Sequence, residues 1–218
     1  MEIQWYGHSS FLLTTEKGIK IIMDPYEPGA FGGGIIYGPI TDKADIVLVS
    51  HDHADHNYVA GLRGSPQVIK AAGRHEVKGI VIEGIPSYHD ASRGSERGKN
   101  IIFIIAADGM RVCHLGDLGH RLSDKEVKEI GQVDCLLIPV GGFYTIGPEE
   151  ATAVAGQLHP KLIIPMHWKT EKCGFPIEPV DPFLQGKKAV QRLKGSIFSF
   201  TKKELAAGLG IVVLQPAL

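Results

Sequence analysis

The strongest constraint on this chain is an apolar run that stops abruptly in a cluster of ionisable side chains. Val47-Leu48-Val49 has the composition of a buried strand, and after Ser50 the chain continues His51-Asp52-His53-Ala54-Asp55-His56. Three imidazoles and two carboxylates within six residues are costly to fold at a strand end unless a partner compensates them. Histidine and aspartate together suit Zn²⁺ or another divalent first-row metal. We therefore predict a metal site rather than a solvated histidine-rich turn.

The spacing within this cluster predicts how its ligands are shared. On an extended backbone every second side chain points to the same side, so His51 and His53 can bind one ion. Asp55 and His56 follow as the chain turns and can serve a second ion. Asn57 is a better candidate for a cap of the following segment than for a ligand.

Apolar runs of strand length recur along the whole chain. The β-branched and aromatic content of these runs, and the turn residues between them, predict strands. They lie at Ile3–Tyr6, Ser10–Thr14, Ile19–Met23, Ile46–Val49, Gln67–Lys70, Ile80–Glu83, Ile101–Ile105, Arg111–His114, Cys135–Ile138, Leu162–Pro165 and Ile211–Leu214. The first three predict an antiparallel meander.

Helix start signals are fewer and fall in the second half. Ser123 and Glu126 form a capping-box pattern that predicts a helix ending at Gly131. Pro148 starts a second helix that ends near His159, and Asp181-Pro182 predicts a third over Phe183–Leu193. Strands followed by strands interleaved with helices indicate a layered α/β (α+β) fold. Because no linker divides the 218 residues, we expect a single domain over residues 1–218.

Composition excludes several classes of function. A net charge of -1 provides no basic field for a nucleic-acid partner. The longest apolar run, Ile101–Ala107, is far below the roughly 20 residues of a membrane span. The first residues lack the basic and apolar regions of a secretory signal, and the three cysteines form no CxxC pair, so we expect a cytoplasmic protein with reduced thiols. Cys113 and Cys135 should be buried, and Cys173 more open.

Two glycine-rich segments predict loops on the surface. Residues 26–38 can form a lid or a plain connection. Residues 92–100 can form a mobile surface loop or a flap that contacts a phosphate.

The pattern His51, His53, Asp55, His56 resembles the HxHxDH signature of the metallo-β-lactamase superfamily. The resemblance implies a four-layer αββα sandwich with two divalent metal ions. Further ligands then fall at His89 in Ser87-Tyr88-His89, at Asp117 in Gly116-Asp117, and at His167 after the strand Leu162–Pro165. It implies His51, His53 and His89 on one metal, Asp55, His56 and His167 on the other, and Asp117 between them.

The resemblance also implies the chemistry of the site. Zn²⁺ is the first expectation, and Mn²⁺ or Fe²⁺ is compatible with the same ligands. Two dications and two carboxylates leave a charge of roughly +2, which favours an anionic small-molecule substrate. A hydroxide bridging the metals would be the nucleophile.

Four residues are candidates for catalytic roles: Asp55, His8, Tyr144 and His120. Gly7-His8-Ser9-Ser10-Phe11 resembles the opening motif of the ascorbate-6-phosphate lactonase-like and N-acylphosphatidylethanolamine phospholipase D-like subgroup. His8 can be a proton shuttle, a substrate contact, an extra ligand or a residue packed beneath the site. Tyr144 can bond substrate or form a wall, and His120 can act as an acid at the site mouth.

Further polar residues fit supporting or surface roles. His114 fits the core or a supporting role, and Asp24 can hold a ligand histidine or form a turn. His75 and His159 should lie on the surface.

The function expected is metal-dependent hydrolysis of a small anionic ester, lactone or phosphodiester. Three alternatives stay open. A nuclease uses the same ligands but needs basic surface, and a di-iron redox protein usually has glutamate at the position of His53. A non-catalytic binding module would have lost ligands, and none is missing here.

Overall fold

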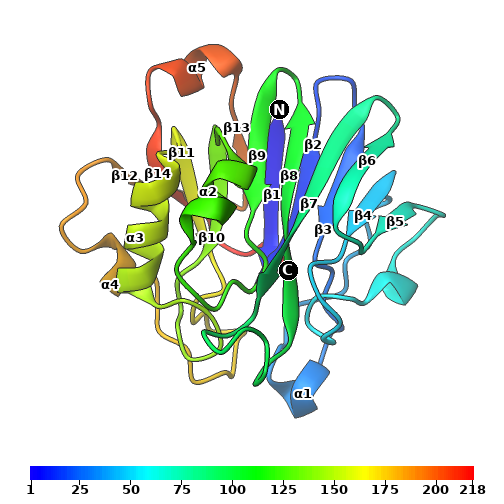
Figure 1. The fold of residues 1–218 in the computed structure, drawn as a ribbon. Coiled ribbons are helices and arrows are strands. Elements are labelled where there is room, and N and C mark those ends of the chain that lie inside the picture. Colours follow the sequence, from blue (N-terminus) through cyan, green and yellow to red (C-terminus); the bar gives the residue numbers. More distant parts are fainter.

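Two mixed β-sheets face each other in the computed structural model, which describes residues 1–218 (Figure 1). The six-stranded sheet has the order β13 (Ile197–Ser199), β1 (Glu2–Gly7), β2 (Ser10–Thr14), β3 (Lys20–Met23), β4 (Ile46–Leu48), β5 (Gln67–Ile69). The eight-stranded sheet has the order β12 (Val190–Arg192), β14 (Gly210–Val213), β11 (Leu162–Met166), β10 (Cys135–Pro139), β9 (Met110–His114), β8 (Lys99–Ala107), β7 (Ile80–Tyr88), β6 (Gly73–Val77). The predicted α/β class and each predicted strand are confirmed.

Strand directions bring several carboxyl ends to one edge of the sandwich. β9, β10 and β11 are parallel, and β7 and β9 are each antiparallel to β8, so β7 runs in the same direction as β9. In the other sheet, β1, β2 and β3 form the predicted antiparallel meander, and β4 is parallel to β3. The loops after β4, β7, β9 and β11 therefore carry their side chains to a common region.

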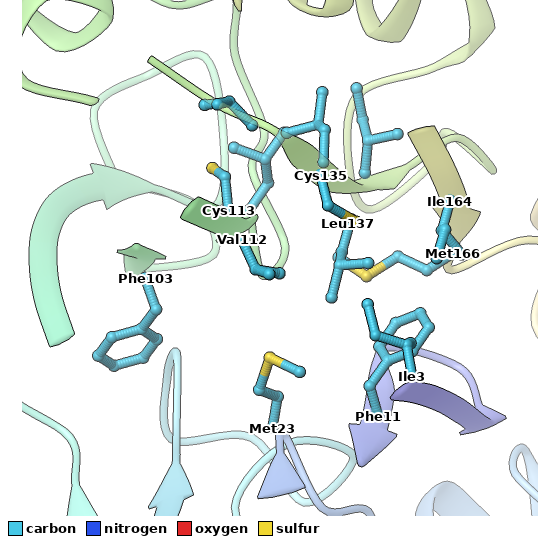
Figure 2. Close-up of a cluster of buried hydrophobic side chains, with 14 of the residues drawn as sticks. Ile3, Phe11, Met23, Phe103, Val112, Cys113, Cys135, Leu137, Ile164 and Met166 are labelled. Atoms are coloured by element: carbon cyan, nitrogen blue, oxygen red, sulfur yellow. The ribbon is translucent and has the colours of Figure 1, made fainter. Parts of the chain in front are cut away.

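The core lies between the sheets and follows the two-residue alternation of their strands. Figure 2 shows Phe11 and Met23 of one sheet turned toward Val112 and Leu137 of the other, while Cys113 turns away from them. All five side chains are fully buried. A strand buried on both faces needs apolar residues at every position, which explains the continuous run Cys135–Pro139 in β10.

Helices cover the outer face of the eight-stranded sheet. α2 (Asp124–Ile130) has the predicted Ser123–Glu126 capping box, and α3 (Pro148–Leu158) begins at the predicted proline. Ile130 of α2 and Val154 of α3 are buried in the main core. Figure 1 shows both helices beside β10 and β11. None of the helices combines the length and apolar composition that crossing a bilayer requires.

The outer face of the six-stranded sheet is covered mainly by the segment after β3. Leu12, Ile22 and Val47 alternate with the core residues of their strands and form a second apolar cluster with Tyr26 and Tyr37. This segment contains only the irregular turn α1 (Ala30–Gly33). It is attached to residues 169–182 by backbone hydrogen bonds from Ile36 to Lys172 (3.0 Å) and from Gly174 to Gly34 (2.8 Å). The predicted loop is therefore an anchored covering layer whose tip carries Phe31.

Three local predictions were wrong or incomplete. The helix predicted over Phe183–Leu193 ends after one turn, as α4 (Asp181–Leu184), because Gln185 is extended and Gly186 has φ +76°. The thiol of Cys173 is buried, not open, since its backbone forms a β-bridge to Ile35 beneath the covering segment. β7 extends to Tyr88 through Pro86, which is tolerated because β6 pairs no further than Gly84.

Several further short elements were not predicted from the sequence. They are the 3₁₀ turn η1 (Val59–Gly61), the strands β6, β12 and β13, and the helix α5 (Lys202–Ala206). α5 has its own capping box between Thr201 and Glu204, which the sequence does contain.

Truncating a side chain between the sheets should measure the contribution of this core. For Leu137→Ala, with a fully buried side chain, we expect the free energy of unfolding to fall by about 2–5 kcal/mol, from lost burial and a residual cavity. Denaturant titration followed by circular dichroism measures it. Val68→Ala on β5, where the side chain is 40% exposed, is the matched control and should cost well under half as much. Equal losses in the two variants would contradict this placement of the core.

Candidate metal centre

Side chains from five loops meet at one edge of the sandwich. The cluster His51–His56 follows β4, His89 follows β7, Asp117 follows β9 and His167 follows β11. His8 lies in the two-residue turn between β1 and β2. The structure brings all seven sequence-predicted ligands into this one region, in agreement with the strand directions.

Asp117 lies at the centre of the cluster and is almost fully buried. Its Oδ2 lies near the Nε2 atoms of four histidines, at 3.1 Å for His56, 3.2 Å for His89, 3.3 Å for His167 and 4.0 Å for His51. One carboxylate oxygen therefore lies within reach of imidazoles from both predicted ligand groups.

The donor atoms fall into two sets. Nitrogens of His51, His53 and His89 lie within 4.8 Å of one another, and the donor atoms of His8, His56, Asp117 and His167 form a second set within the same distance of one another. The second set differs from the predicted one, because it includes His8 and does not include Asp55. Asp55 lies beside this set, with its Oδ2 3.0 Å from His8 Nε2 and 3.7 Å from His56 Nε2. Five buried atoms of the predicted ligands have no hydrogen-bond partner: His51 Nε2, His56 Nε2, Asp55 Oδ1, His89 Nδ1 and His167 Nδ1. A buried polar atom without a partner costs about 1–3 kcal/mol. The arrangement and its chemistry therefore fit divalent cations, for which these atoms are ordinary ligands.

Electrostatics prepare this cluster for a cation. Burial alone would raise the pKa of Asp117, but His167 and His56 hold that pKa well below its usual range. Burial and the neighbouring His56 lower the pKa of His51, and burial and His89 lower the pKa of His53. An ionised carboxylate and neutral imidazoles are the protonation states that bind metal.

His89 and His56 depart from this pattern. Burial lowers the pKa of His89, but Asp117 outweighs burial and raises that pKa above the ordinary value. Three carboxylates surround His56. Burial lowers its pKa, but Asp117, Asp55 and Asp24 outweigh burial and raise the pKa well above the ordinary value. A proton therefore competes with a cation for this ring.

Asp24 holds the site from beneath. It is fully buried, its Oδ2 accepts from His56 Nδ1 (3.0 Å), His114 Nε2 (2.8 Å) and Ser50 Oγ (2.7 Å), and its Oδ1 accepts from the Ser50 N–H (2.7 Å). A hydrogen bond to Nδ1 fixes the ring of a metal-binding histidine and leaves Nε2 free. Asp24 therefore orients His56, and His114 is a buried partner of Asp24 rather than a residue of the cavity.

His8 also contacts the cluster from the protein interior. The side chain is fully buried, with Nε2 3.0 Å from Asp55 Oδ2 and its ring centroid 4.1 Å from that of His167. It is not among the residues that line the cavity, and its donor atom belongs to the second set of possible metal ligands. Its contact is with a predicted ligand.

Three non-glycine residues of the site have left-handed backbone conformations, with φ +51° at His8, +44° at Asp24 and +49° at His167. Such residues cost about 1–3 kcal/mol each and persist where surrounding structure fixes them. The His167 N–H donates to the His8 carbonyl at 3.0 Å, which couples two of these positions.

Close contacts explain why glycine residues flank Asp117 in the loop after β9. A Cβ on Gly116, where φ is +55°, would lie 2.4 Å from Asn100 Oδ1, and one on Gly119 would lie 2.3 Å from the His89 carbonyl carbon. Asn100 Oδ1 in turn accepts from the Asp117 N–H at 3.1 Å. These close approaches place Asp117 against the loop of His89, and the sequence offered no signal for Asn100.

A cavity of about 270 Å³ opens onto the cluster. Of the predicted non-ligand residues, Tyr144 lines it. Four lining residues were not predicted individually: Phe31, Glu96, Arg97 and Phe175. Their only sequence signal is a large aromatic or charged side chain within a glycine-rich or polar loop.

His120 lies elsewhere, contrary to the expectation that it reaches the site mouth. It lines a different cavity, where its Nε2 accepts from the Tyr88 N–H (3.3 Å) and faces Glu126 Oε1 (3.6 Å). The chain turns after Gly119, which packs against the His89 backbone, and directs the next side chain away from the metal cluster.

Comparisons with known proteins agree with this architecture. The family model described as the beta-lactamase superfamily domain matches residues 2–167. A crystal structure of a metallo-beta-lactamase superfamily protein from Thermotoga maritima superposes with a TM-score of 0.80 and 40% sequence identity, covering 98% of this chain and 97% of the other. A metallo hydrolase from Ignicoccus hospitalis has the same fold, with a TM-score of 0.67 and 23% identity over 100% of this chain and 96% of the other.

A curated relative indicates the kind of activity. The UPF0173 metal-dependent hydrolase of Archaeoglobus fulgidus is 31% identical over 211 residues, which cover 84% of this chain and 87% of that protein. This similarity agrees with the geometry of the site, because the cluster offers the histidine and aspartate donors that a metal-dependent enzyme needs. The chain belongs to the metallo-β-lactamase superfamily and is one of its metal-dependent hydrolases.

Proposed function

We propose that this protein hydrolyses a small anionic ester, lactone or phosphodiester with two divalent cations, of which Zn²⁺ is the first candidate. His51, His53 and His89 would hold one cation, Asp55, His56 and His167 the other, and Asp117 would lie between them. The observation that carries this proposal is the position of Asp117 Oδ2, close to imidazoles of both groups. Two of these imidazoles, His51 and His56, have a buried Nε2 atom without a hydrogen-bond partner.

Bound cations would polarise the substrate oxygen and lower the pKa of a water molecule toward neutrality. The chain's own residues prepare that chemistry. Asp24 and His8 orient His56 and Asp55 through hydrogen bonds of 3.0 Å. Tyr144 lines the cavity and offers a phenol donor to substrate. Phe31 and Phe175 give the cavity an apolar part of its wall.

A small substrate fits this site better than a nucleic acid. The cavity is only about 270 Å³ and three of its ten lining residues are aromatic. The net charge of -1 gives no general attraction to phosphodiester chains. A nuclease would bind oligonucleotides with steep salt dependence, and such binding would replace this proposal with the nuclease alternative. Iron with visible redox absorbance in untreated protein would instead favour a redox function.

The direct test combines metal analysis with hydrolysis. Metal-free protein is reloaded with Zn²⁺, Mn²⁺ or Fe²⁺, and the metal-to-protein ratio is compared with turnover of p-nitrophenyl acetate, γ-thiobutyrolactone and bis(p-nitrophenyl) phosphate. We expect about two ions per chain and turnover of at least one probe that a chelator removes.

A matched pair of histidine variants completes the test. His53→Ala should lower turnover by more than ~100-fold, the upper range for residues that only support a ligand. His75→Ala, on β6 and outside the cluster, should match the wild type. Full activity of His53→Ala, or activity that survives chelation, would contradict the proposal.

A further inference from the structure

The metal cavity contains one permanently charged cationic side chain, Arg97. The other lining residues are histidines, carboxylates and the aromatic residues Phe31, Tyr144 and Phe175. The Arg97 side chain is 35% exposed, so its head group meets both cavity and solvent. Five N–H donors in a planar fork match carboxylate and phosphate oxygens.

The backbone of Arg97 is held by a buried carboxylate. Asp90 accepts from the N–H groups of Ser92 and Gly94 at one oxygen (2.8 Å each) and of Glu96 and Arg97 at the other (3.1 and 2.8 Å). Asp90 directly follows His89, so the loop 90–98 is fixed to the metal cluster at its first residue. Arg97 is thus a positioned residue rather than part of a free surface loop.

The guanidinium retains donors for a ligand. Its Cζ lies 5.9 Å from the centroid of the Tyr144 ring, a cation–π distance. Its intramolecular ion-pair partner is Glu96, with Nη1 and Oε2 3.6 Å apart, while Glu96 Oε1 accepts from Ser92 Oγ at 2.6 Å. An ion pair this long and this exposed is weak and leaves most of the fork unoccupied.

The facing wall is aromatic. Phe175 lies between Phe31 and Tyr144, with edge-to-face ring distances of 5.6 and 5.5 Å. Phe31 is 59% exposed, which is unusual for a large apolar side chain unless a ligand or partner covers it. An apolar group of the substrate would fit against these rings, between the metal cluster and Arg97.

A second cavity adjoins the metal cavity beside Arg97. Arg97 and His53 also line a neighbouring cavity of about 810 Å³, along whose walls lie Lys70 and Lys99. An anionic group that reaches past the metal cavity therefore meets further positive charge.

We propose that Arg97 is a specificity-determining residue that binds a second anionic group of the substrate, a carboxylate or phosphate separate from the bond that is cleaved. This rests on the proposed hydrolytic function. The substrate class is then an ester, lactone or phosphodiester in which an apolar segment joins the reacting group to a remote anion.

Ligand binding tests this proposal without turnover. Benzoate is titrated calorimetrically into Zn²⁺-loaded protein and compared with phthalate, isophthalate and terephthalate, which add a second carboxylate at three spacings, and with 4-phosphonobenzoate. We expect the best dianionic probe to bind wild-type protein at least ~10-fold more tightly than benzoate, as one charge-assisted hydrogen bond predicts. The phosphonate arm distinguishes a phosphate from a carboxylate preference.

Two variants of one loop assign the preference. In Arg97→Gln the ratio of the two affinities should fall to near one. In Arg93→Gln, which removes the same charge from the same loop but from a side chain lining the His120 cavity, the ratio should stay at the wild-type value. No preference in the wild type, or an equal preference in Arg97→Gln, would overturn the assignment. These ratios are measured by binding, so they test the role of Arg97 independently of turnover. Absence of hydrolysis in the separate activity assay would reject the proposed function alone.

Discussion

Asp117→Asn is expected to lose bound metal and hydrolytic activity together. In this nearly isosteric variant, the negative charge that lies 3.1–3.3 Å from His56, His89 and His167 is removed. An amide is a much weaker ligand than a carboxylate, and its NH₂ group would oppose a cation. We expect metal content to fall below one ion per chain and turnover to drop by more than ~100-fold, beyond the range for supporting residues.

The matched control for this variant is Asp52→Asn. Asp52 lies within the same histidine cluster, but it is exposed, its carboxylate accepts from Asn57, and it lines the neighbouring cavity of about 810 Å³ rather than the metal cavity. Its metal content and turnover should stay close to wild type. Elemental analysis after gel filtration and a hydrolysis assay measure both properties. Wild-type metal content in Asp117→Asn would rule out Asp117 as the shared ligand.

The sequence and the family resemblance together identified the side chains that meet at the site, because the positions of these side chains depend on strand ends. Because His51–His56 follows the end of β4, these side chains lie at an edge of the sheet regardless of how the other loops fold. Asp117 and His167 likewise follow β9 and β11 directly, and parallel strands bring their ends together. Periodicity and turn residues carry that information locally, so the fold class could be predicted from them and from the family resemblance.

The residues that shape the cavity could not be predicted because their positions depend on loop packing. Phe31 reaches the cavity only because the segment after β3 is bonded to residues 169–182. Arg97 does so only because Asp90 folds the loop 90–98 back on itself. His120 illustrates the opposite case. It is only three residues from Asp117 in sequence, but its side chain lines a different cavity. Proximity along the chain does not determine which side of a loop a side chain occupies.

Asp24→Asn is expected to destabilise the protein and weaken metal binding from a position outside the cavity. Four donors point at the two oxygens of Asp24, from His56, His114 and twice from Ser50. An asparagine has one acceptor oxygen, so its amide N–H groups would face at least one of these donors. Breaking such a buried polar network costs about 3–5 kcal/mol. We also expect metal affinity to fall ~10–100-fold, because an uncharged amide oxygen holds the His56 Nδ1–H more weakly than a carboxylate does and so orients the ring less firmly.

His114→Gln separates the two effects of Asp24. His114 contacts the same oxygen of Asp24 as His56 but is not one of the predicted ligands, so its loss should lower the free energy of unfolding but leave His56 bonded and metal affinity near wild type. Denaturant titration of metal-free protein measures stability, and competition with a chromophoric chelator measures affinity well below the unfolding midpoint. If both variants lost stability and neither lost affinity, Asp24 would be a core residue only. A loss of affinity confined to Asp24→Asn would mean that this carboxylate sets the strength of the metal site from outside the cavity, through its hydrogen bonds to His56 and to Ser50, whose Oγ also lies 2.9 Å from His51 Nδ1.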